Sequence, residues 1–361
     1  MSIALFPLSF YNICILFYFA LPFHSFLSFI HFYQEVLSMD YSSFCSLLGT
    51  ELLNLLPPQT RISQEQIRKN NGVLLDSFCI VSPGSPCSPV VYLDPLYQDL
   101  RSGVPISDIV FSVLKAIQKH PPFSEDGILR LTDPEHAKPH IAFRLISKKA
   151  NKTLLTEVPW LPFLDLAIVF FIHLSSDGGG QAGALIRNSQ AELLGLTSDE
   201  LWKIAASNTP LLFPSVQNRL DDLLYIQSGP ASVPKDSTAI TEDSPSASET
   251  KKEEESQLLP QVMVLSNTTG IYGASCLLYG GILDSLCQRM DSDLLVLPSS
   301  IHEVLILPAL SDIDCIGLKK IIRQINREEL SREDFLSDEL YFYSRKKRKL
   351  KIWTSPGGSD T

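Results

Sequence analysis

The chain has 361 residues, of which 45% are hydrophobic and 19% charged, a composition that excludes a wholly disordered protein and allows one or two domains. Its formal net charge of −10 gives no general attraction to nucleic acid or anionic lipid, so either partner requires a local basic surface. The seven cysteines form no Cys-x-x-Cys pair, which favours scattered reduced thiols in a cytoplasmic protein over a disulfide framework.

The N-terminal extension, residues 1–38, is strongly apolar, and residues 1–34 contain no Asp, Glu, Lys or Arg. Residues 3–21 are long enough to cross about 30 Å of hydrocarbon. No basic segment precedes them and the first cation is Arg61, so they make a poor signal peptide or oriented span. We expect a misassigned start, with translation beginning at Met39. A single-pass membrane anchor is the alternative.

A low-complexity segment divides the rest of the chain. Residues 228–257 contain seven Ser, three Pro, seven acidic and three Lys residues, and they cannot bury enough apolar surface to offset their ordering entropy. We expect a disordered linker there. It would join an N-terminal lobe, residues 39–227, to a C-terminal lobe, residues 258–344, which is followed by a basic tail, residues 345–361.

Elements of the N-terminal lobe follow from periodicity and capping signals. Ser107 is a suitable cap for an amphipathic helix that ends before Pro121, and the capping box from Thr197 to Glu200 starts another helix. Alternating or continuous apolar runs predict extended segments at residues 73–81, 90–93, 141–146, 164–174 and 184–194.

In the C-terminal lobe the predicted order is strand, strand, helix, strand, strand, helix. Strands at residues 261–266 and 271–277 flank a hairpin loop at residues 267–270, a helix begins near Ile282, and strands follow at residues 293–297 and 303–307. Asp312 or Asp314 caps the last helix, whose expected buried stripe is Ile316, Ile321, Ile322 and Ile325. This order predicts an α+β fold with mixed, largely antiparallel sheets and helices packed on one face.

The turn at residues 297–308 concentrates reactive side chains between two aliphatic runs. In an extended segment Ser300 and His302 project to the same side, so the imidazole could contact the hydroxyl and a carboxylate. Glu303 adjoins them, and Asp165 stands alone in an apolar strand. A structural interpretation competes: the hydroxyls stabilise the turn, and His302 and Glu303 satisfy neighbouring strand ends.

One basic cluster offers a local nucleic-acid surface. It lies near the aromatic residues 341–343 and Trp353, which could stack on bases while the cations hold phosphates. A solvated turn or tail is the alternative. The candidate residues are Arg345, Lys346, Lys347, Arg348 and Lys349.

Two further patterns favour structural explanations. The glycine run at residues 178–183 matches G-x-G-x-x-G, but the sequence behind it does not open a helix, so a hairpin loop is expected rather than a dinucleotide site. His136 and His140 have the spacing of two helical metal ligands, but Pro139 opposes that helix, and no third ligand is nearby. We predict no metal or cofactor site, and cofactors stay unknown.

The chain resembles a bacterial family catalogued as domain of unknown function 5688. The resemblance rests on several blocks together: Lys69-Asn-Asn-Gly72, residues 158–167, Asn208-Thr-Pro210, residues 273–279 and Leu297-Pro-Ser-Ser-Ile-His-Glu303. It implies an intracellular bacterial protein without an assigned reaction, so it supplies no catalytic residues. We therefore expect a noncatalytic cytoplasmic binding or regulatory module with unknown partners. A small hydrolase using Ser300, His302 and Asp165 or Glu303 is the alternative.

Overall fold

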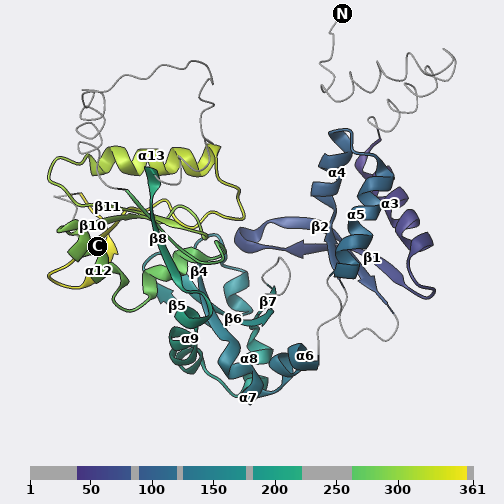
Figure 1. Cartoon of the computed structure of the whole chain (residues 1–361), viewed down its shortest axis with the longest axis horizontal. Helices are drawn as coiled ribbons and strands as arrows, with labels where there is room; N and C mark the ends of the chain where they lie inside the picture. The colour runs from purple at the N-terminus through teal and green to yellow at the C-terminus, as the bar shows by residue number, and fades with distance from the viewer. Residues whose placement is uncertain (1–38, 83–88, 120–124, 176–181, 222–261, 356–361) are drawn as a thin grey trace, which may run out of the picture. The chain divides into compact units, whose positions relative to one another are not determined.

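A computed structural model describes residues 39–82, 89–119, 125–175, 182–221 and 262–355 (Figure 1). The chain divides into two compact units. Unit 1 is Met1–Lys69 with Val73–Glu125, and unit 2 is Asn70–Gly72 with Asp126–Thr361. The candidate site residues of the sequence analysis all fall in unit 2.

Unit 1 packs helices against one face of a three-stranded antiparallel sheet of order β1-β2-β3. Phe78 and Ile80 point from β2 into a core shared with Phe44 and Leu48, while most of β1 is exposed. Asp40 caps the first helix by accepting from the Ser43 amide. The elements are α3 (Tyr41–Leu55), β1 (Arg61–Arg68), β2 (Leu74–Val81), β3 (Val90–Tyr92), α4 (Leu93–Arg101) and α5 (Ile106–Lys119).

The larger sheet of unit 2 has six antiparallel strands in the order β13-β12-β10-β11-β9-β8. Helix α13 lies across one face, where Ile322 meets Phe342 of β12 (Figure 1). The next residue on β12, Tyr343, points to the other face and donates to Asp284 of α12. Both faces therefore carry a helix. The elements are β8 (Ser215–Arg219), β9 (Met263–Asn267), α12 (Ile282–Met290), β10 (Leu294–Leu297), β11 (Val304–Pro308), α13 (Cys315–Glu328), β12 (Tyr341–Ser344) and β13 (Lys349–Ile352).

The smaller sheet of unit 2 is built around β6, which pairs with β4 on one side and with β5 and β7 on the other. The free edge of β4 is covered by hydroxyls: Thr209 of α9 accepts from the Phe143 amide and Ser275 of η4 from the Leu145 amide. The elements are η1 (Asn70–Gly72), α6 (Glu125–Thr132), α7 (Pro134–Ala137), η2 (Lys138–His140), β4 (Ile141–Ser147), η3 (Leu154–Thr156), β5 (Trp160–Phe163), β6 (Leu166–Ser175), β7 (Ala182–Leu185), α8 (Asn188–Leu194), α9 (Ser198–Leu212) and η4 (Gly273–Leu278).

The predicted α+β class with antiparallel sheets is confirmed. The capping box is present at the start of α9, where the side chains of Thr197 and Glu200 each accept from the other residue's amide. Asp314 caps α13 by accepting from the Ile316 and Gly317 amides. Residues 176–181, which hold most of the glycine run, lie outside the described residues, between the antiparallel strands β6 and β7.

Four local predictions were wrong. Ser107 lies within α5 rather than capping it. Residues 188–194 form helix α8 rather than an extended segment, and Gly195 ends the helix with a left-handed φ of 65°. No hairpin forms around residues 267–270, because β9 already pairs with β8 and β11 and the chain continues into the 3₁₀ helix η4. On α13, Ile322 is buried but the other three isoleucines of the predicted stripe are exposed: Ile316 at 56%, Ile321 at 52% and Ile325 at 45%.

The boundary between the two compact units does not fall at residues 228–257. Strands β8 and β9 come from opposite sides of that segment and pair with each other, so the predicted lobes share one sheet. The predicted tail beyond residue 345 contributes edge strand β13. Residues 1–38 and 228–257, with the predictions made for them, lie outside the described residues. Among the helices of the described ranges, none has the length and apolar character needed to cross a membrane.

Gly273 marks a close approach of three chain segments and generates a test of the fold. A Cβ at this position would lie 2.8 Å from the Asn267 nitrogen and closer still to the His302 carbonyl oxygen. Gly273→Ala should therefore lower the free energy of unfolding by roughly 2 to 4 kcal/mol, measured by urea denaturation. Gly280→Ala is the matched control, since a Cβ there meets nothing within 4 Å. Equal effects of the two substitutions would refute this packing.

Candidate functional site

His302 lies in the turn between β10 and β11 and uses both ring nitrogens within the fold. Its Nε2 lies 3.0 Å from Asp334 Oδ1, and the Tyr272 amide donates a long 3.4 Å hydrogen bond to Nδ1. These partners favour the neutral tautomer that carries its proton on Nε2. The side chains of His302 and Asp334 are 34% and 33% exposed, so this pair lies at the surface.

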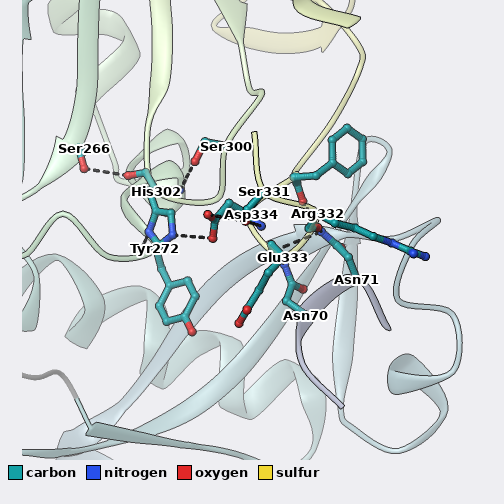
Figure 2. Close-up of polar contacts among 11 residues, drawn as sticks. Asn70, Asn71, Ser266, Tyr272, Ser300, His302, Ser331, Arg332, Glu333 and Asp334 are labelled. Carbon is teal, nitrogen blue, oxygen red and sulfur yellow. Dashed lines mark hydrogen bonds and ion pairs between the residues drawn. The ribbon is translucent and has the colours of Figure 1, made fainter. Parts of the chain in front are cut away.

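The hydroxyl of Ser300 serves the main chain of the same turn. Ser300 Oγ accepts a 3.0 Å hydrogen bond from the His302 amide, as Figure 2 shows, and Ser300 is only 8% exposed. On the other side, Ser266 Oγ donates to the His302 carbonyl at 2.8 Å. The turn is therefore fixed by hydroxyl to backbone bonds, as in the structural interpretation of the sequence.

The Tyr272 ring stacks beside His302, and the Arg144 guanidinium lies over the Tyr272 ring. The Tyr272 ring is nearly parallel to the imidazole, with 17° between planes and 6.0 Å between centroids, and Arg144 Cζ lies 4.4 Å from the Tyr272 centroid. Tyr272 has a left-handed φ of 56°, which is strained for a bulky residue. That conformation turns the chain from β9 into η4 and directs the Tyr272 amide at His302.

Asp334 belongs to the segment formed by residues 331–335, which is bound from two sides. Ser331 Oγ donates to Asp334 Oδ2 and accepts from the Asp334 amide, which orients the carboxylate toward His302. The Ile301 amide donates to the Asp334 carbonyl at 2.9 Å. An isolated β-bridge pairs Ser300 with Phe335. The segment is therefore a turn that is joined to the β10 to β11 turn by this bridge and by the Ile301 bond.

Asn70 and Asn71 bind the opposite side of the segment (Figure 2). Asn71 Nδ2 donates to the carbonyls of Arg332 and Phe335 at 2.9 and 2.6 Å. Its Oδ1 accepts from Asn151 Nδ2, and Asn151 Oδ1 accepts from the Asn71 amide, both at 2.8 Å. Asn71 is 4% exposed and has a left-handed φ of 57°, a conformation that Asn tolerates well.

The predicted acids do not join Ser300 and His302. Asp165 accepts from Ser337 Oγ at 2.6 Å and from the Tyr341 hydroxyl at 2.5 Å. Burial, followed by the Asp165 charge, raises the pKa of Tyr341, so its hydroxyl keeps the proton that it donates. Glu303 is exposed. The carboxylate at His302 is that of Asp334, and the Ser300 hydroxyl contacts the His302 amide rather than its ring.

The basic cluster forms the turn between β12 and β13 and a part of β13. Arg345 Nη1 lies 2.7 Å from Asp291, and Arg348 pairs with Asp284 of α12 through Nε at 2.9 Å. Lys346, Lys347 and Lys349 are exposed. Both arginines therefore tie the turn to acidic residues of the protein itself, which reduces the positive charge offered to a phosphate backbone.

The histidines with metal-ligand spacing point to different surroundings. His136 is exposed and its Nδ1 lies 2.9 Å from Asp133 Oδ1. His140 precedes β4, and the register of β4 with β6 places it beside His173. Burial lowers the pKa of both His140 and His173, and Arg130 adds to each shift. Within the described ranges, no group of three or more potential ligands could hold a metal.

Sequence reasoning missed the residues that complete the site. Asp334 and Tyr272 lie 32 and 30 positions from His302 in the chain, and neither belongs to a recognisable motif. Asn71 had a signal, because it is part of the Lys69-Asn-Asn-Gly72 block that carried the family resemblance.

The asparagine pair gives a test of how the 331–335 segment is held. Asn71→Ala removes the donors to two partly buried carbonyls and the contact with Asn151, and it places Ala at a left-handed position. It should lower the free energy of unfolding by about 2 to 4 kcal/mol. Asn70→Ala removes one side-chain hydrogen bond, to the Glu333 carbonyl, and should cost about 1 kcal/mol or less. Chemical denaturation of both variants measures this, and equal costs would contradict the assigned role of Asn71.

The buried histidines generate a pH prediction. Because the folded pKa values of His140 and His173 lie below the ordinary histidine value of 6.5, the unfolded chain binds more protons than the folded chain below that pH. Their contribution to stability is complete above pH 6.5 and is lost as pH falls through the folded pKa values. Denaturation at pH 7.5 and about 5.5 should show a smaller acid loss in His140→Gln/His173→Gln than in wild type. An equal acid loss in the wild type and the double variant would contradict this role of His140 and His173.

Comparison with known proteins places this site within a recognised family. No curated protein and no solved structure matches the chain. A family of unknown function (DUF5688) matches residues 41–345, which include every strand of the six-stranded sheet except β13, and the whole of the His302 site. The chain belongs to that family of unknown function (DUF5688).

Proposed function

We propose that this chain is a noncatalytic cytoplasmic binding or regulatory protein, in which Ser300 and His302 hold the fold together. The observation that carries the proposal is the use of both His302 ring nitrogens by Asp334 and the Tyr272 amide. A general base needs a nitrogen that faces the proton it removes, within hydrogen-bond reach of the nucleophile. Here the nitrogen that lacks a carboxylate partner faces a main-chain amide.

The position of Ser300 supports the same proposal. A serine nucleophile needs an accessible hydroxyl directed at the base and at the substrate. Ser300 is 8% exposed and its Oγ accepts from the His302 amide, so the oxygen is engaged in closing the turn. A hydrolase would need the turn to open and the His302 ring to reorient.

The buried Cys276 and Cys287 are equally unsuited to nucleophilic catalysis. The five cysteines of the described ranges are free thiols. Burial raises the pKa of Cys276 to about 12 and that of Cys287 to about 11, so both stay protonated at neutral pH. Free buried thiols suit the reducing compartment that this proposal assigns. The membrane-anchored alternative depends on residues 3–21, which lie outside the described residues.

A fluorophosphonate probe, which reacts covalently with activated serine hydroxyls, separates the two functions. We expect no adduct at Ser300, read by peptide mass spectrometry, with a known serine hydrolase as the positive control. His302→Gln should lower the free energy of unfolding by about 1 to 2 kcal/mol, since it removes the bond to Asp334. An adduct at Ser300 that disappears in His302→Gln would overturn the proposal in favour of the hydrolase.

A further inference from the structure

The groove between α13 and the β13 edge of the large sheet is shaped to receive a side chain. A cavity of about 440 Å³ lies there, bounded by Ile316 and Lys319 of α13 and by Ile352 and Trp353 at the end of β13. A second cavity of about 400 Å³ shares Ile316 and Trp353 with the first and adds Ile313 and Phe342. The two form one groove with a mainly apolar floor. Ile316 is 56% exposed, so this floor is open to solvent.

Positive charge gathers around this groove although the protein as a whole is acidic. Lys320 and Arg323 line the first cavity from α13 and make no ion pair within the described residues. Lys319 is neutralised by Glu339. On β13, Lys351 stands opposite Phe342 in register, so its side chain lies on the face that α13 covers, and Lys349 shares that face. The groove thus has an apolar floor, with Lys320 and Arg323 on the α13 side and Lys349 and Lys351 on the β13 side. The two acids that line it are engaged within the fold: Glu339 pairs with Lys319, and Asp314 caps α13.

The main chain of β13 adds hydrogen-bonding capacity to the groove. β13 is the last strand of the sheet, and the Trp353 amide donates inward to the Leu340 carbonyl. Backbone groups alternate in direction along an antiparallel strand, so those of Lys349 and Lys351 also point toward β12. The amides and carbonyls of Leu350 and Ile352 therefore point outward. Nothing in the described residues pairs with them.

We propose that the β13 edge binds an extended peptide of a partner protein that alternates acidic and apolar residues, by adding it as a further strand. This inference rests on the proposed binding function and names its partner class. The peptide backbone pairs with Leu350 and Ile352. Its acidic side chains lie on the face that carries Lys349 and Lys351, and its apolar side chains lie on the opposite face, beside those of Leu350 and Ile352. Its carboxylates lie beside Lys351, Lys320 and Arg323.

The lysines on this edge also explain why it would be selective. Exposed Lys side chains on an edge strand oppose pairing with a second basic or neutral strand, because they would be buried unpaired. An acidic strand converts that repulsion into attraction. Nucleic acid fits less well, because the groove floor is apolar and a phosphate backbone has no amide donors for the outward carbonyls of β13.

The test uses the full chain and a fluorescein-labelled peptide of alternating Glu and Val, followed by fluorescence polarisation. A peptide of identical composition with the Glu and Val residues in two separate blocks is the control. We expect saturable binding of the alternating peptide and at least roughly tenfold weaker binding of the block peptide, because only the alternating peptide presents one side chain type per face. Two N-methylated forms of the alternating peptide extend the test, one methylated on every Glu amide and the other on every Val amide. One form should bind more weakly and the other should bind as the unmodified peptide does, since only alternate amides of an added strand face β13.

Charge-reversal variants locate the site on the protein. Lys320→Glu/Arg323→Glu should weaken peptide binding at least about tenfold, whereas Lys203→Glu on the exposed side of α9 should change it less than about threefold. No saturable binding, equal binding of both peptides, or stronger binding of an oligothymidylate that depends on Lys320 and Arg323 would each overturn the proposed partner. These outcomes are independent of Ser300 labelling, so loss of this partner class and loss of the noncatalytic function are distinguishable.

Discussion

The 331–335 segment is the constraint on which the candidate site depends. Its carbonyls are partly buried in these contacts, and a fully buried carbonyl without a donor costs about 1 to 3 kcal/mol. Asn71 supplies donors to Arg332 and Phe335, and the Ile301 amide supplies the donor to Asp334. Because of these bonds, the segment lies against the β10 to β11 turn, and the Asp334 carboxylate lies within hydrogen-bond distance of His302.

The packing around His302 also restricts the first residue of η4, Gly273. Gly273 lies where the β9 strand end, the η4 helix and the His302 carbonyl meet, and there is no space for a Cβ. The strained φ of Tyr272 is acceptable in this setting because its amide bonds His302 and its ring lies between the imidazole and Arg144. Three family blocks, at residues 69–72, 273–279 and 297–303, are therefore packed into one network of hydrogen bonds.

Unit 2 has two basic regions, which differ in whether carboxylates of the protein itself pair with their cations. The β12 to β13 turn uses Arg345 and Arg348 to bind Asp291 and Asp284, which fixes the turn against α12. On the opposite face, α13 presents Lys320 and Arg323 beside exposed isoleucines rather than beside carboxylates. Cations that are paired internally support the fold, whereas cations beside an open apolar groove are suited to a partner that brings its own carboxylates.

The sequence by itself determined the α+β class with largely antiparallel sheets, the cap at Thr197, and the concentration of polar side chains around Ser300 and His302, because these follow from local periodicity and short-range hydrogen bonding. It narrowed the cap of α13 to Asp312 or Asp314, and the structure selects Asp314. Tertiary structure alone decided which carboxylate meets His302. Asp165 was the natural candidate from its apolar surroundings, but it is satisfied by Ser337 and Tyr341, while Asp334 arrives from a loop. It also decided that β8 and β9 share a sheet and that only Ile322 of the expected α13 stripe is buried. Strand partners and buried helix faces depend on contacts between distant segments, and no periodicity within one segment encodes them.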